Sequence, residues 1–284
     1  MMSKLIDGKL VGGVVREKIK KEVACLLEKM GQKPNLTVII VGENPASLSY
    51  VKSKHKFATE VGFESQTILL DANVSEEVLL TTIMTLNDDE FVHGILVQLP
   101  LPTHIDEQKI IRSIAVEKDV DGFHPEQVGG LSLGLDTLAP CTPAGIIQLL
   151  NHYDIPISGR HAVIIGRSNI VGKPIAQMLL KLDATVTITH SRTANLTELT
   201  RMADILIVAI GSPRFLAAEM VKEGAVVIDV GINREAGKLV GDVDYEAVLE
   251  RVSYITPVPG GVGPMTIAML LANTLEAFKR QIKD

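Results

Sequence analysis

Apolar residues in the first half of the chain form short continuous runs, separated by segments with helical periodicity. The runs predict buried strands at residues 35–42, 65–70 and 92–98. The periodic segments predict helices at residues 13–30, 46–61 and 75–86. Ser75 is a suitable N-cap for the third helix, because its hydroxyl can accept a bond from a free backbone N–H. Alternating strands and helices indicate a parallel sheet with right-handed crossovers.

The second half repeats this alternation. Its predicted strands are residues 161–166, 185–190, 204–211, 225–231 and a short 254–256. These strands are almost continuously apolar, which is typical of a parallel sheet covered on both faces. The last predicted helix, residues 265–282, is long enough to leave this sheet and pack on the first half of the chain.

A segment rich in glycine and proline separates the two halves. It reads GGLSLGLDTLAPCTP, residues 129–143, and we expect it to be a connection between domains. Thr142 is the expected cap of the helix that follows, PAGIIQLLNHY. The pattern therefore predicts an α/β protein of two domains with a cleft between them.

Composition limits the kind of partner. The chain has 284 residues, of which 46% are hydrophobic, enough for two domains with their own cores. A formal net charge of -6 argues against a nucleic-acid partner and favours small molecules. Two cysteines, Cys25 and Cys141, are too few for a disulfide framework, which suits a reducing compartment. With no signal-like stretch and no run of roughly 18 to 20 apolar residues, we expect a cytoplasmic protein with no membrane partner.

One short pattern imitates a metal site. Glu117, Asp119, Asp121 and Gly122 are spaced like the start of a calcium loop, but Val128 stands where the closing glutamate belongs. The seven histidines are scattered and form no HExxH pair. We therefore expect no metal.

A glycine turn, GRSNIVGKP (residues 166–174), lies between the strand at 161–166 and a helix. Such a turn lets the backbone approach a phosphate and directs free N–H groups at it. The G-x-G-x-x-G fingerprint is not met, because Ser168 replaces the second glycine and the next glycine is Gly172. Position in the fold nevertheless predicts nucleotide binding at Gly166, Arg167 and Ser168.

The next strand ends in Ser191, Arg192 and Thr193. NAD-binding proteins carry an acidic residue there, about 20 residues beyond the turn, to bind the ribose hydroxyls. Here Arg167, Arg192 and the Ser191 hydroxyl suit a 2′-phosphate instead, because arginine offers paired donors. The cofactor expected is NADP. The fold class is thus an N-terminal three-layer α/β substrate domain and a Rossmann-like NADP-binding domain: residues 1–140, joined by the helix at about 265–284, and residues 141–264.

The segment YVKSKHKF, residues 50–57, carries three lysines. On a helix, Tyr50 and Lys54 share one face, whereas Lys52 and Lys56 point elsewhere. The spacing selects Lys54 for chemistry, with a solvated basic surface as the alternative.

Seven motifs follow one another along the chain: YVKSK, GILVQLPLP, KDVDGFHP, PCTPAGI, GRSNIVGKP, VIDVGIN and ITPVPGGVGPMT. In this set and order the chain closely resembles the bifunctional methylenetetrahydrofolate dehydrogenase/methenyltetrahydrofolate cyclohydrolase family. The resemblance covers about Ile6 to about Leu275. It implies NADP-dependent oxidation of 5,10-methylenetetrahydrofolate, then hydrolysis to 10-formyltetrahydrofolate, without a fused synthetase domain.

The resemblance also implies roles for single residues. Tyr50 and Lys54 match the family's catalytic pair, Gln98 matches the glutamine that bonds the lysine, and Asp121 matches the acid that holds the pterin. The residues matching the cofactor site are Gly166, Arg167, Ser168 and Ile232. The loop shared by folate and cofactor is matched by Gly261 and Pro264. A homodimer joined through the cofactor domains is implied as well.

Three other interpretations are less consistent with the sequence. In short-chain dehydrogenases a Tyr-x-x-x-Lys pair follows the glycine turn, whereas Tyr50 and Lys54 precede it here by more than a hundred residues. A two-domain shikimate or amino-acid dehydrogenase shares the architecture, but PVPGGVGPMT argues against it. A non-catalytic NADP-binding regulator would need no proton-transfer lysine.

Overall fold

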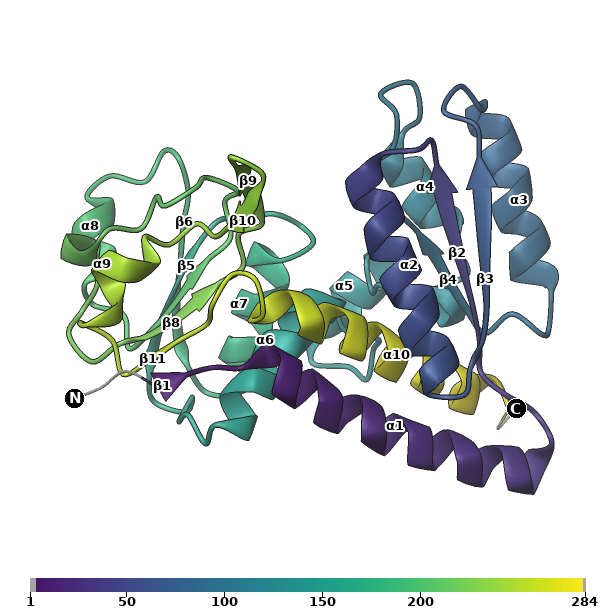
Figure 1. Ribbon diagram of the computed structural model, residues 1–284, viewed down its shortest axis with the longest axis horizontal. Helices are drawn as coiled ribbons and strands as arrows, with labels where there is room; N and C mark the ends of the chain where they lie inside the picture. Colours follow the sequence, from purple (N-terminus) through teal and green to yellow (C-terminus); the bar gives the residue numbers. More distant parts are fainter. Residues whose placement is uncertain (1–3, 283–284) are drawn as a thin grey trace. The chain divides into compact units, whose positions relative to one another are not determined.

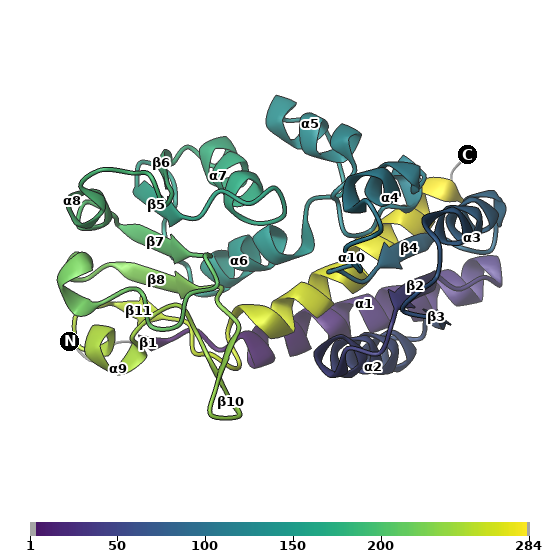
Figure 2. The same cartoon turned by 90° about the horizontal axis from the view of Figure 1, so that it is seen from above.

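The computed structural model describes residues 4–282, apart from the side chains of residues 45, 46 and 49 (Figures 1 and 2). The chain divides into two compact units. The three-stranded unit consists of Val14–Cys141 and the residues from Ile267 onward. The six-stranded unit consists of the residues up to Gly13 and Thr142–Thr266. The cleft expected between the two domains stays a prediction.

The three-stranded unit contains a parallel sheet in the order β3-β2-β4. Its strands are β2(Asn35–Val41), β3(Glu64–Leu70) and β4(Gly94–Val97). Its helices, two of which begin in the other unit, are α1(Gly8–Met30), α2(Pro45–Glu60), α3(Glu76–Asp88), α4(Glu107–Ser113), η1(Val116–Lys118), α5(Pro125–Leu133) and α10(Val262–Gln281).

Helices cover both faces of this sheet, as the alternation of side chains along β2 requires. Leu36, Val38 and Ile40 enter one core with residues of α1, α2 and α10. Ile39 and Val41, which point the other way, enter a second core with residues of α3 and α4. The predicted three-layer arrangement is therefore confirmed, and the last helix packs on this sheet as expected.

The six-stranded unit contains a parallel sheet in the order β1-β11-β8-β7-β5-β6. Its strands are β1(Lys4–Leu5), β5(His161–Ile165), β6(Thr185–Thr189), β7(Ile205–Val208), β8(Val226–Asp229) and β11(Tyr254–Ile255). A separate antiparallel hairpin is formed by β9(Asn233–Glu235) and β10(Lys238–Val240). The helices are α6(Cys141–His152), α7(Gly172–Lys181), α8(Leu196–Thr200), η2(Ala218–Met220) and α9(Tyr245–Leu249).

The strand order identifies where this sheet binds ligands. Counted from β5, the strands are arranged 2-1-3-4-5, a doubly wound order whose direction reverses between β5 and β7. In such sheets the crevice at the carboxyl ends of the two strands beside the reversal takes the ligand. The turn after β5 lies at that edge.

The eight strands expected from apolar runs are all present, and Ser75 caps α3 through a bond from the Val78 N–H. The interdomain connection was predicted too long, because residues 129–133 belong to α5, which ends at Gly134 in a left-handed conformation. Thr142 is not a cap, because α6 already begins at Cys141. Its hydroxyl instead lies 2.9 Å from the hydroxyl of Thr266.

The beginning of the chain departs from the expected domain limits. Residues 1–140 were expected to belong together, but β1 pairs in parallel with β11, and the residues up to Gly13 belong to the six-stranded unit. A two-residue strand carries no periodicity from which it could be predicted. The neighbouring Gly8 is required at its position, because a Cβ there would lie 1.7 Å from the carbonyl oxygen of Gly261.

Candidate functional site

Lys54 is a buried lysine on α2, with 4% of its side chain exposed. Its ammonium lies 4.8 Å from the ring centroid of Tyr50, one helical turn earlier, within the range of a cation–π contact. The other two lysines of the segment are exposed, and Lys56 pairs loosely with Glu60 at 3.8 Å. The four-residue spacing therefore separated one buried lysine from two solvated ones.

Gln98 fixes the position of the Lys54 ammonium. It follows the last residue of β4, and its Oε1 accepts a hydrogen bond from Nζ of Lys54 at 2.9 Å. The other end of the amide donates from Nε2 to the carbonyl oxygen of Leu99 at 2.7 Å. This second bond determines which way the amide is turned, so the oxygen faces Lys54.

The surroundings of Lys54 favour its neutral form. Burial lowers the pKa of Lys54, and this effect outweighs the opposing attraction of the nearby Asp121 and Cys141. Burial likewise raises the pKa of Asp121, against the charge of Lys54 and a hydrogen bond from Cys141. A buried lysine whose pKa is lowered in this way gives up its proton more readily than an exposed ammonium does.

Asp121 sits in a tight loop that is organised around Asp119. A carboxylate oxygen of Asp119 accepts from the His124 N–H at 2.7 Å. Burial, together with the charge of Asp121, raises the pKa of Asp119 to about 7, although bonds from the backbone of Gly122, Phe123 and His124 oppose this. Asp119 was weighed only as a calcium ligand from the sequence, and its place at the centre of the loop was missed.

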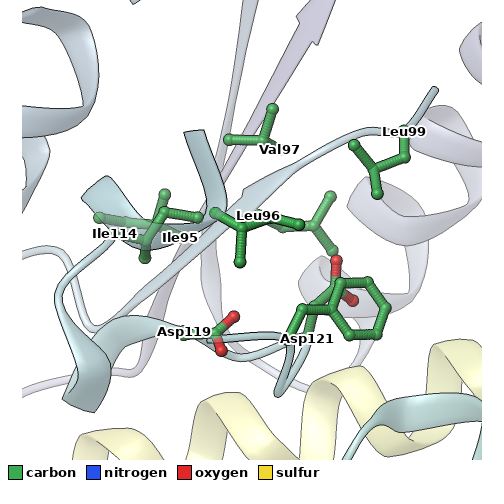
Figure 3. A pocket seen from close by; sticks show the side chains of 9 residues that line it. Ile95, Leu96, Val97, Leu99, Ile114, Asp119 and Asp121 are labelled. Atoms are coloured by element: carbon green, nitrogen blue, oxygen red, sulfur yellow. The ribbon is translucent and has the colours of Figure 1, made fainter. Parts of the chain in front are cut away.

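Figure 3 shows Asp119 and Asp121 with the apolar side chains of Ile95, Leu96 and Val97 on β4. These residues line a cavity of about 10 Å³, which is roughly the space of one water molecule. The side of the loop that faces the sheet is thus closely packed, which holds Asp121 in place. Gly122 is needed for this packing, because its φ is 72° and a Cβ would lie 2.5 Å from the Leu138 carbonyl oxygen.

No group of three or more histidine, cysteine, aspartate or glutamate side chains in residues 4–282 is arranged to hold a metal ion. Nor does any helix of that range have the length and hydropathy needed to cross a bilayer.

The turn between β5 and α7 is tightly packed at two glycines, although its sequence departs from the fingerprint. Gly166 has a φ of 124°, and a Cβ there would lie 2.3 Å from the Ala209 carbonyl oxygen on the neighbouring strand's loop. A Cβ on Gly172 would lie 2.4 Å from the Gly166 carbonyl oxygen. Only glycine fits at either position, so strand and helix approach as closely as dinucleotide binding requires.

Ser168 organises this turn. Its hydroxyl oxygen accepts from the N–H groups of Val171 and Gly172, each at 3.2 Å, at the start of α7. Since the oxygen only accepts in these bonds, its proton is available to donate to an anion. Arg167, which precedes Ser168, is exposed, so its guanidinium is accessible to a ligand.

Ser191 and Arg192 follow β6 and are exposed beside this turn, because β6 pairs with β5 in register. A bond from the Arg192 N–H to Nδ1 of His190, at 3.2 Å, shapes the loop. Ile232 follows β8 and is 63% exposed. All six expected cofactor residues therefore lie in the six-stranded unit, in loops after β5, β6 and β8.

Gly261 directly precedes α10 and Pro264 lies in its first turn, and both belong to the six-stranded unit. The Gly261 N–H donates to the Pro257 carbonyl oxygen at 2.9 Å, and a Cβ there would lie 2.6 Å from the same atom. The four expected catalytic residues, by contrast, all belong to the three-stranded unit.

Comparison with known proteins agrees with this division. The family model "Tetrahydrofolate dehydrogenase/cyclohydrolase, catalytic domain" matches residues 6–121, and the model for the NAD(P)-binding domain of that family matches residues 140–282. The bifunctional protein FolD of Campylobacter hominis is 59% identical over 280 residues, 98% of each chain.

Two solved structures are similar over the whole fold. The FolD dehydrogenase/cyclohydrolase of Campylobacter jejuni has a TM-score of 0.96 at 54% identity, with 98% of this chain and 99% of that one covered. The Trypanosoma brucei enzyme, complexed with NADP and an inhibitor, has a TM-score of 0.96 at 40% identity over the full length of both chains. From sequence and fold together, this chain belongs to the tetrahydrofolate dehydrogenase/cyclohydrolase family.

Proposed function

We propose that this chain oxidises 5,10-methylenetetrahydrofolate to the 5,10-methenyl compound with NADP⁺, and then hydrolyses that product to 10-formyltetrahydrofolate. The observation that carries the proposal is the buried Lys54, held by Gln98 at 2.9 Å and depressed in pKa by its burial. A protein that only bound nucleotide would gain nothing from burying an ionisable amine.

The first step needs little acid or base catalysis. The one-carbon bridge of the substrate lies between two nitrogens, whose lone pairs stabilise the cation that remains when a hydride leaves. NADP⁺, when bound, supplies the hydride acceptor. The protein's part is to hold the two reactants in the correct orientation, which can contribute several orders of magnitude in rate.

The second step requires proton transfers. Water attacks the methenyl carbon and gives up a proton, which leaves a neutral tetrahedral adduct. The hydroxyl of this adduct then loses its proton as the bond from carbon to N5 breaks, and N5 takes up a proton. In our proposal Lys54 exchanges these protons, and Gln98 and Tyr50 orient it. The cationic substrate further disfavours a charged Lys54, which strengthens the tendency set by burial.

Asp121 is proposed to hold the pterin by accepting bonds from its amino group and ring N–H. The tight loop around Asp119 supports this role, because it fixes the carboxylate before substrate arrives. Gly261 and Pro264 are proposed to contact substrate at the start of α10.

NADP is proposed in preference to NAD. The Gly166 and Gly172 contacts form a turn that fits a dinucleotide phosphate, with Ser168 as a donor. The exposed Arg167, Ser191 and Arg192 fit an additional 2′-phosphate, and no acidic residue stands at the end of β6. The Trypanosoma brucei relative, which was solved with NADP, supports the same choice.

A homodimer through the six-stranded units is proposed as well. β6 is an edge strand of its sheet and carries Ile188 with 38% exposure, a surface that pairing with a second copy would cover. Light scattering should give a mass of about twice 30.7 kDa. A monomeric mass at micromolar concentration would remove this part of the proposal.

One optical assay tests both activities, because methenyltetrahydrofolate absorbs distinctively in the near ultraviolet. With the methylene substrate and NADP⁺ the absorbance should rise, and with preformed methenyl compound alone it should decay faster than in buffer. Turnover of neither kind would favour a non-catalytic binding protein. Reduction of NADP⁺ by hydride from a shikimate-type substrate would favour the dehydrogenase alternative.

A further inference from the structure

Two buried carboxylates lie at the carboxyl edge of the six-stranded sheet, outside the residues assigned so far. Asp229 is the last residue of β8 and is 3% exposed, and Asp242 follows β10 and is fully buried. Each accepts three hydrogen bonds from N–H groups. Burying a carboxylate costs desolvation free energy, so we expect these two acids to have a structural role in the loops that they connect.

Asp229 holds the segment that follows the hairpin. Its Oδ1 accepts from the N–H groups of Gly231 and Asp242, each at 2.9 Å, and its Oδ2 accepts from the Val243 N–H at 3.0 Å. Its own N–H donates to the Thr256 hydroxyl at 2.7 Å. Asp229 thereby joins the loop after β8 to the start of the segment that leads into α9.

Asp242 connects a third loop. Its Oδ2 accepts from the N–H groups of Ile210 and Gly211, at 2.8 and 2.9 Å, in the loop after β7. Its Oδ1 accepts from the side-chain amide of Asn233 at 2.9 Å. The loops after β7 and after β8 are therefore held to one carboxylate.

Two glycines make room for this arrangement. A Cβ on Gly231 would lie 2.2 Å from Oδ1 of Asp242. A Cβ on Gly241 would overlap Asp229, at 1.8 Å from its Oδ2. The close approach of both carboxylates to the backbone is thus built into the sequence, in VIDVGIN and VGDVD.

The consequence falls on Ile232. The residue before it, Gly231, is bound to Asp229, and the residue after it, Asn233, is bound to Asp242. The backbone on both sides is fixed while the Ile232 side chain remains 63% exposed. In the strand order, β8 lies across the reversal from β6, where the 2′-phosphate of the adenosine half is proposed to bind. A planar ring packed on the exposed Ile232 side chain would therefore be the nicotinamide and not the adenine.

We infer that Asp242 is a positioning residue for hydride transfer. Through its bond to Asn233, and together with Asp229, it fixes Ile232 against the nicotinamide ring. The inference rests on the proposed use of a nicotinamide dinucleotide. It assigns no contact between either aspartate and the cofactor.

Exchanging the side chains of Asn233 and Asp242 tests the inference. Asn233→Asp alone places two carboxylates face to face and breaks the bond to Asp242, and we expect the dehydrogenase kcat at saturating NADP⁺ to fall about tenfold, the effect of one charge-assisted hydrogen bond. Adding Asp242→Asn restores a donor–acceptor pair of reversed polarity, and most of the lost rate should return. Lys238→Ala, exposed on the same hairpin, is the matched control.

Three further readouts separate positioning from folding. Cyclohydrolase activity, which needs no nicotinamide, should stay within about twofold, as should the affinity for adenosine 2′,5′-bisphosphate, which lacks the ring. The deuterium isotope effect on hydride transfer should rise, because that step becomes slower. Equal losses in kcat and adenosine 2′,5′-bisphosphate binding, or no rescue in the double variant, would overturn the inference. An inactive parent protein would instead contradict the proposed function.

Discussion

Nζ of Lys54 lies 2.9 Å from Oε1 of Gln98, so the buried amine is held by a neutral acceptor. A glutamine can orient the amine without adding an opposite charge beside it. A carboxylate at the same place would favour the ammonium form by direct attraction. The choice of an amide here therefore keeps Lys54 able to exchange a proton.

Gln98→Glu should raise the pKa of Lys54 and weaken cyclohydrolase activity at pH 7 by at least about tenfold, the result of a shift of one unit or more. Because the amine loses its proton only at higher pH in this variant, the loss should shrink as the pH rises. The pH–rate profile measures this. Gln98→Met, which removes the acceptor without adding charge, should lose activity by a factor that does not depend on pH; identical profiles for both variants would contradict the account.

Replacing Arg167 and Arg192 by glutamine should raise the KM for NADP⁺ by about 10-fold to 100-fold per arginine, the usual effect of losing a charge-assisted bond. The KM for NAD⁺, which lacks the 2′-phosphate, should change little. Arg160→Gln, an exposed arginine at the opposite end of β5, is the control and should leave both constants unchanged. Equal increases for the two cofactors would remove the argument for NADP.

Asp119 should make the fold less stable as the pH rises from about 4 to 7. The raised pKa, about 7 against an ordinary 3.8, means that the folded chain keeps a proton that the unfolded chain has lost in this range. Stability then decreases with pH by up to about 1.4 kcal/mol per unit from this group.

Asp119→Asn removes that dependence, although it also weakens the loop. Its free energy of unfolding should therefore approach or pass that of the parent as the pH rises from 4.5 to 6.5, in urea titrations at each pH. Asp136→Asn, a change at an 89% exposed side chain, should give a curve parallel to the parent. A parallel curve for Asp119→Asn would show that Asp119 is ionised throughout.

The sequence predicted the elements that depend on long apolar patterns. β2, for example, places side chains in two cores, so it needs apolar residues on both faces, and NLTVIIV supplies them. β1 is two residues long, and β9 and β10 are three residues each, too short for a pattern. β1 forms because it pairs with β11, some 250 residues along the chain, whereas β9 and β10 pair with each other. α5 was hidden because its sequence, PEQVGGLSL, contains two glycines that suggest a loop.

The candidate site divides in the same way. The Tyr50 and Lys54 pair could be selected from spacing within one helix. The hydrogen bond between Lys54 and Gln98, however, depends on how α2 packs on the sheet that contains β4. Asp119, Asp229 and Asp242 could not be selected, because their partners are mainly backbone N–H groups, which any sequence supplies. A clue was present in the glycines beside them, Gly122, Gly231 and Gly241, where close approach excludes a side chain.

The most direct test of the account is the comparison of Lys54→Gln with Lys56→Gln, two changes one half-turn apart on α2. Lys54→Gln should lower cyclohydrolase activity by about 10²-fold or more, the usual contribution of a proton-transfer group, and leave dehydrogenase turnover measurable. Lys56→Gln, at a 70% exposed side chain, should leave both activities unchanged. Retention of full methenyltetrahydrofolate hydrolysis by Lys54→Gln would contradict the role assigned to this lysine.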